Sequence, residues 1–74
     1  MNIENTLNEG IDILKKNKIS NPQLDSEILL SNSIKKDKKH IILNPKELLN
    51  LEQSKRFKSL IERRKKGEPI AYLI

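Results

Sequence analysis

Residues 21–34 read Asn-Pro-Gln-Leu-Asp-Ser-Glu-Ile-Leu-Leu-Ser-Asn-Ser-Ile, and this stretch decides the fold. Asn21 and Pro22 form a helix start signal, because an Asn side chain can cap free amides and Pro has no N–H to leave unbonded in the first turn. The apolar residues that follow spread around more than half of a helical wheel. We therefore expect a helix over residues 22–34 that is the central and most buried one.

Two amphipathic segments flank this central helix. The first covers residues 3–16, where apolar side chains recur at spacings of four, four and three: Ile3, Leu7, Ile11 and Leu14. The second runs from residue 51 or 52 to 66 and has a stripe formed by Phe57, Leu60 and Ile61. These spacings predict one apolar face on each helix. Gly67 can adopt the left-handed conformation that ends the second of them.

The remaining segments are short. The run His40–Leu43 fits a strand or a helical turn equally well, and we favour a short helix because no second strand is available. Asn44 and Pro45 repeat the start signal, with Glu47 placed to reach back to the cap, which predicts another short helix to about residue 50. Residues 70–74 are apolar and strand-like, so we expect a mobile tail that the core does not need.

The predicted fold is thus all-α, a small bundle of four to five helices with an extended apolar C-terminal tail. Residues 1–67 form the domain, and residues 68–74 begin a linker. An exposed apolar end favours a fragment of a longer protein over a domain that is closed at both termini.

Composition excludes several classes of site. The chain has no cysteine and one histidine, so neither a disulfide framework nor a Cys/His metal site is expected. Its two glycines do not form a phosphate-binding loop, and no nucleophile is paired with a base. The longest apolar run has five residues, too few to cross a membrane. We expect a cytoplasmic, monomeric protein with no catalytic, cofactor or metal residue in this chain.

The net charge of +5 raises the question of an anionic partner. Its excess lies in the second half, where six cations surround one helix: Lys55, Arg56, Lys58, Arg63, Lys65 and Lys66. A solvated face is the default interpretation, and steering towards an acidic patch on a protein is the alternative. Nucleic acid is not the partner that we expect, because these cations are mostly Lys and no residues are arranged to contact base edges.

Two motifs resemble one family when they are taken together. Residues 21–30 match a Pro-x-Leu-Asp-x-Glu-(Leu/Ile)-Leu-Leu helix, and residues 63–72 match Arg-Arg-x-x-Gly-Glu-Pro-(Ile/Leu)-x-Tyr. Both are typical of the N-terminal helical domain of the HemK (PrmC) protein-(glutamine-N5) methyltransferases. The order and spacing of the helices also agree, so the resemblance spans essentially the whole chain.

This resemblance implies the N-terminal domain of an enzyme that uses S-adenosylmethionine. The family methylates the glutamine of the Gly-Gly-Gln motif in peptide chain release factors, and its N-terminal domain helps to hold that protein substrate. The family's cofactor loop and Asn-Pro-Pro-Tyr catalytic motif are absent here, so none of its catalytic or cofactor residues can be assigned to this sequence. The implied partners are a release factor and a C-terminal methyltransferase domain. The alternative is a stand-alone basic helical module that binds a protein or, less favoured, nucleic acid.

Arg64 is the residue of greatest interest, because it projects to the middle of the apolar face of its predicted helix. One interpretation is a structural ion pair with Asp25 or Glu27 on the central helix, where a buried carboxylate needs a cation. The other is that Arg64, together with Glu68 and Tyr72, faces a partner or the neighbouring domain. Candidate partner or interdomain contacts are Arg63, Arg64, Glu68 and Tyr72.

Overall fold

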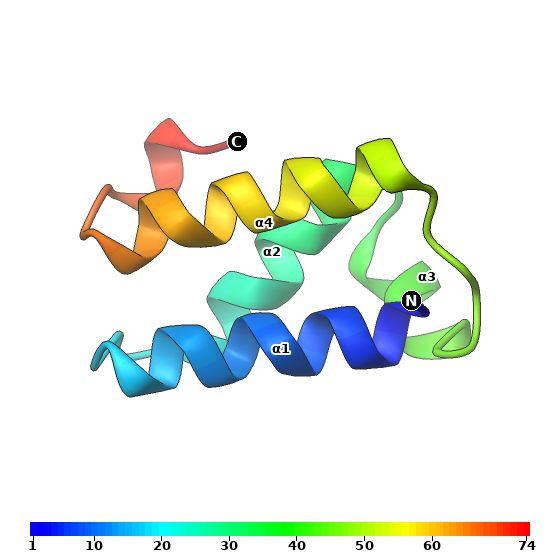
Figure 1. The fold of residues 1–74 in the computed structure, drawn as a ribbon, viewed down its shortest axis with the longest axis horizontal. Helices are drawn as coiled ribbons and strands as arrows, with labels where there is room; N and C mark the ends of the chain where they lie inside the picture. The colour runs from blue at the N-terminus through cyan, green and yellow to red at the C-terminus, as the bar shows by residue number, and fades with distance from the viewer.

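The computed structural model describes all 74 residues as four α-helices and one short 3₁₀ helix (Figure 1). The elements in chain order are α1 (Ile3–Lys16), α2 (Pro22–Ile34), α3 (Lys38–Leu43), α4 (Leu51–Lys65) and the 3₁₀ helix η1 (Ile70–Tyr72). The predicted small all-α bundle is confirmed. No helix is both long and apolar enough to span a membrane, and no group of side chains is arranged to hold a metal ion.

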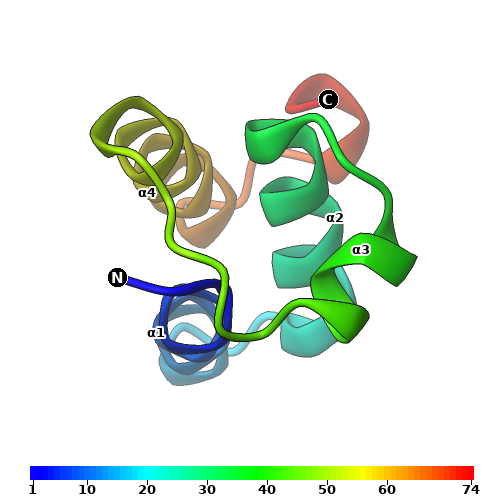
Figure 2. The same cartoon turned by 90° about the vertical axis from the view of Figure 1, so that its right-hand side faces the viewer.

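Helix α2 is the centre of the bundle. Figure 2 shows α1 and α4 on one side of it and α3 on the other, and α2 packs against all three. Seven of its thirteen residues are buried: Asp25, Ser26, Glu27, Leu29, Leu30, Ser33 and Ile34. A helix that is contacted from several sides cannot have a narrow apolar stripe, which is why its apolar residues spread around the wheel.

Helices α1 and α4 lie side by side (Figures 1 and 2). They approach closely at Gly10. A Cβ atom added at Gly10 would lie 2.6 Å from Phe57 Cζ and 3.1 Å from Ile61 Cδ1. Glycine within a helix costs about 1 kcal/mol relative to alanine. Because Gly10 has no side chain, the Phe57 ring can rest directly on the backbone of α1.

Side chains cap three of the four helices at their N-termini. Asn2 Oδ1 accepts from the Asn5 amide at 2.8 Å, and Asp37 Oδ1 accepts from the His40 amide at 2.9 Å. At α4, Asn50 and Gln53 form a reciprocal capping box. Helix α2 differs, because Asn21 makes no side-chain capping bond and only Pro22 marks its start.

The short helix predicted over residues 45–50 is wrong. This segment instead turns and forms an isolated antiparallel bridge between Asn2 and Leu48. The amide of Ile3 donates to the Glu47 carbonyl at 2.9 Å, so the segment satisfies a free amide at the start of α1. The Glu47 carboxylate does not accept from the Asn44 amide and instead lies 2.9 Å from His40 Nε2. Hydrogen bonds with the first residues of the chain therefore override the helix start signal at Asn44 and Pro45.

The extended tail predicted for residues 70–74 is also wrong. Residues 70–72 form a 3₁₀ turn, and the amide of Leu73 donates to the Ile70 carbonyl at 3.0 Å. Leu73 is 5% exposed and belongs to the hydrophobic core, whereas Tyr72 and Ile74 remain exposed. Without a neighbouring strand, the segment satisfies its backbone locally and buries one side chain.

Candidate functional site

The Arg64 side chain extends from α4 towards α2 and makes two hydrogen bonds. Its Nε donates to Asp25 Oδ2 at 2.9 Å, and its Nη1 donates to the Glu68 carbonyl at 3.0 Å. The Arg64 and Asp25 side chains are only 20% and 10% exposed, so water screens this ion pair weakly. Of the two carboxylates proposed from sequence, Arg64 therefore pairs with Asp25.

Arg63 forms a second, exposed ion pair with Glu68. Its Nε and Nη2 donate to the two carboxylate oxygens at 2.8 and 2.9 Å, a bidentate geometry that suits guanidinium and carboxylate. Hydrogen bonding by Arg63 lowers the pKa of Glu68 and, reciprocally, raises the pKa of Arg63. Two consecutive arginines thus hold Glu68, one by its side chain and one by its backbone, just after the turn at Gly67.

Glu27 is buried on α2 but does not belong to the Arg64 pair. Its carboxylate lies 3.3 Å from Lys38 Nζ and 3.4 Å from Gln23 Nε2. Residues two apart on a helix face nearly opposite directions, which is why Asp25 meets α4 and Glu27 meets α3. Of the two predicted alternatives, the pair of Arg64 with Asp25 forms, and Glu27 pairs instead with Lys38 on the other side of α2.

The Glu27–Lys38 pair lies in an open groove between the start of α2 and α3. The groove is lined by Ser20, Asn21, Pro22, Gln23, Leu24, Glu27, Lys38 and Ile42. Leu24 and Ile42 are 46% and 60% exposed despite being apolar. Sequence reasoning missed this groove because the position of α3 against α2 depends on tertiary packing, and neither helix carries a local signal for it.

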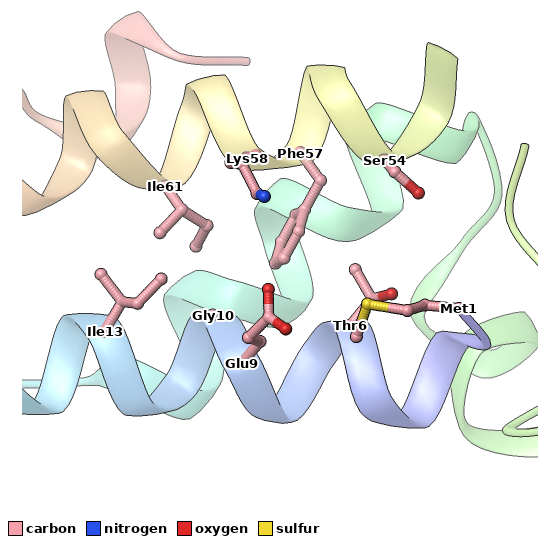
Figure 3. A pocket seen from close by; sticks show the side chains of 9 residues that line it. All are labelled: Met1, Thr6, Glu9, Gly10, Ile13, Ser54, Phe57, Lys58 and Ile61. Atoms are coloured by element: carbon pink, nitrogen blue, oxygen red, sulfur yellow. The ribbon is translucent and has the colours of Figure 1, made fainter. Parts of the chain in front are cut away.

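A smaller cleft lies between α1 and α4 (Figure 3). Its cavity of about 70 Å³ is lined mainly by apolar surface from Met1, Gly10, Ile13, Phe57 and Ile61, with Thr6, Glu9, Ser54 and Lys58 completing it. The Thr6 hydroxyl is buried without a hydrogen-bond partner. Gly10 and the Phe57 ring that packs on it both line this cleft.

The remaining sequence-selected residues lie outside these clusters. The Tyr72 side chain is exposed, and its hydroxyl makes no hydrogen bond to Arg63, Arg64 or Glu68. Among the six cations around α4, three are paired, through Arg56–Glu52, Arg63–Glu68 and Lys65–Glu62. Lys55, Lys58 and Lys66 have no ion-pair partner. The basic surface is therefore less available to an anion than the sequence alone indicates.

Comparison with known proteins decides the family. The model of the family described as the PrmC N-terminal domain matches residues 5–74. The chain belongs to this family. In this PrmC N-terminal domain, the Arg-Arg-x-x-Gly-Glu motif is the segment that forms the two arginine–Glu68 contacts. The Asp of the Pro-x-Leu-Asp motif is Asp25, which accepts from Arg64.

Individual relatives agree with this assignment. A release factor glutamine methyltransferase of Clostridium botulinum is 35% identical over the whole chain, and one of Buchnera aphidicola is 40% identical over the whole chain. A bifunctional methyltransferase of Rickettsia bellii is 39% identical over 97% of the chain. The PrmC N-terminal domain spans 26% of the length of the first two relatives and 13% of the third. No solved structure matches the chain.

Proposed function

We propose that this domain holds the protein substrate of an S-adenosylmethionine-dependent methyltransferase that modifies the Gly-Gly-Gln glutamine of peptide chain release factors. Residues 1–67 form the recognition domain, and residues 68–74, of which Leu73 packs in its core, begin the linker to the methyltransferase domain. The match of residues 5–74 to the PrmC N-terminal domain carries this proposal. Relatives named release factor glutamine methyltransferase support it.

The contacts of the domain support a binding role over a chemical one. Its ionisable clusters are ion pairs, Arg64–Asp25, Arg63–Glu68 and Lys38–Glu27, and none of them places a nucleophile beside a general base. S-adenosylmethionine and the catalytic groups would be supplied by the methyltransferase domain. The isolated 74-residue chain is accordingly a non-catalytic part of the enzyme.

A methylation assay tests the proposal. The longer polypeptide that contains this domain is mixed with S-adenosylmethionine and a release factor, and the Gly-Gly-Gln peptide is analysed by mass spectrometry. We expect one added methyl group on the glutamine side chain. A release factor with Gln→Ala in the motif is the control and should remain unmodified. Methylation at another residue, or none, would contradict the proposed substrate.

A second assay isolates the contribution of the domain itself. The same enzyme without residues 1–74 should methylate a whole release factor more slowly, mainly through a higher KM, because the substrate is no longer held. An unchanged KM for the release factor would remove the substrate-holding role while leaving the enzyme assignment intact.

A further inference from the structure

Of the two buried carboxylates, Glu27 is the one with the longer contacts. It is 7% exposed, yet its contacts to Lys38 and Gln23 are 3.3 and 3.4 Å long. Asp25 on the same helix is equally buried and has a guanidinium nitrogen at 2.9 Å. Charge-assisted N–H···O bonds usually measure about 2.7–2.9 Å. Both oxygens of Glu27 thus have only long contacts, so a closer donor can still improve on them, whereas Asp25 already has a short, charge-assisted bond.

Lys38 is a partner that another cation can displace. Its side chain is 56% exposed, so it can leave the carboxylate and remain solvated. The buried Glu27 carboxylate needs a cation beside it, and an incoming guanidinium supplies that charge as Lys38 leaves. When Lys38 swings away, the Glu27 carboxylate is presented to the groove between α2 and α3, which both residues line.

The walls of this groove suit an arginine side chain on an extended peptide. Leu24 and Ile42 offer exposed apolar surface on which the methylene groups of an arginine can pack, while the guanidinium meets Glu27. Asn21 makes no capping bond, so the first amides of α2 lack a side-chain acceptor. Backbone carbonyls of an extended segment can supply that acceptor. An anionic ligand fits less well, because Glu27 would repel it.

We propose that this groove binds an arginine of an extended segment on the protein partner, and that its guanidinium displaces Lys38 from Glu27. The inference rests on the proposed function in one respect, namely that the partner is a release factor. Beyond the proposed partner, it specifies that the partner's contact is a basic side chain. Glu27 is the recognition residue, and Lys38 is the intramolecular competitor that occupies its place.

The test uses the 74-residue chain and the peptide N-acetyl-Gly-Arg-Gly-amide, followed by NMR of the labelled protein. The peptide with citrulline in place of arginine has nearly the same shape without the charge. We expect the arginine peptide to shift the amide signals of the groove and to bind at least about tenfold more tightly than the citrulline peptide, because a charge-assisted bond is lost. Glu27→Gln should cause a similar loss.

A matched pair of lysine variants tests the displacement step. Lys38→Ala removes the competitor and should tighten binding of the arginine peptide. Lys39→Ala removes the same charge from the neighbouring position, where no ion pair forms, and should bind the peptide nearly as the unaltered chain does. Neither variant removes a core side chain, so this comparison remains available even if Glu27→Gln lowers the folded population. The free energy of unfolding of Lys38→Ala is measured alongside, because this variant leaves Glu27 without its cation.

Three results overturn the inference: equal binding of the arginine and citrulline peptides, unchanged binding by Glu27→Gln, or no difference between the two lysine variants. A titration with a release factor separates this inference from the proposed function. If the release factor binds the unaltered chain and Glu27→Gln equally, the groove is wrong and the function stands. If the arginine peptide binds at Glu27 but the release factor does not bind, the groove stands and the proposed partner is wrong.

Discussion

Arg64 and Arg63 are adjacent in sequence but differ in how much of their side chains is buried. Arg64 lies between two helices and pairs with a carboxylate that is 10% exposed, whereas Arg63 meets Glu68 at the surface. The wheel of α4 predicted the inward direction of Arg64 from sequence alone. It did not predict which carboxylate Arg64 would meet, because that depends on how α2 is rotated in the bundle.

We predict that Arg64→Ala lowers the free energy of unfolding by roughly 2 to 4 kcal/mol, because Asp25 is left buried without its cation. Arg63→Ala is the matched control and should leave the free energy of unfolding nearly unchanged, since its partner stays solvated. Urea unfolding followed by circular dichroism measures both. Unchanged stability of Arg64→Ala combined with weaker substrate binding would instead support the partner-facing interpretation.

The Arg63–Glu68 pair predicts a pH effect with a defined sign. The Arg63 guanidinium holds the pKa of Glu68 below its ordinary value. The pair therefore makes its small contribution to stability above the unfolded-state pKa of Glu68, and this contribution is lost as the pH falls through the lower folded-state pKa. In an NMR titration of the carboxyl carbon, Arg63→Ala should return the Glu68 pKa towards its ordinary value. An equal pKa in both proteins would contradict the assignment.

At the scale of the helix, the close packing of α1 against α4 depends on Gly10. The sequence pattern predicts both helices, and three members of the predicted α1 stripe, Ile3, Leu7 and Leu14, belong to or pack on the core, whereas Ile11 does not. The pattern gives no reason for a glycine at position 10. The structure gives its reason, since the Phe57 ring occupies the space that a side chain would need. Contacts between helices of this kind cannot be read from the periodicity of either helix.

We predict that Gly10→Ala destabilises the chain by about 1 to 3 kcal/mol through overpacking, despite its gain in helix propensity. Asn8→Ala, at an exposed position of the same helix, is the control and should be neutral or slightly stabilising. Thermal unfolding of the two variants provides the comparison. Stabilisation by Gly10→Ala would mean that α1 and α4 do not approach as closely as described.

At the scale of the whole molecule, the core includes a residue that the sequence pattern assigned to a free tail. The strand-like composition of residues 70–74 indicated an extended segment, but Leu73 packs in the core formed by the helices. The segment between α3 and α4 was assigned incorrectly for a related reason, because its backbone bonds are made with the start of α1. Both errors concern segments whose conformation is set by distant parts of the chain.

Leu73→Ala should accordingly cost about 2 to 5 kcal/mol of stability, the usual range for a buried leucine. Tyr72→Ala is its control, and because that side chain is 75% exposed, the change in stability should stay within about 0.5 kcal/mol. Chemical unfolding separates the two. A mild effect at Leu73 would support the free tail expected from sequence.

The central claim is that the PrmC N-terminal domain holds a release factor, and the most direct measurement is a titration of the labelled 74-residue chain with that protein, followed by NMR. A single-stranded RNA of comparable charge is the control for non-specific attraction to the basic surface. We predict saturable binding to the release factor that perturbs a defined set of amide signals, with weaker and strongly salt-dependent effects of the RNA. No binding to the release factor, or preferential binding to the RNA, would contradict the account.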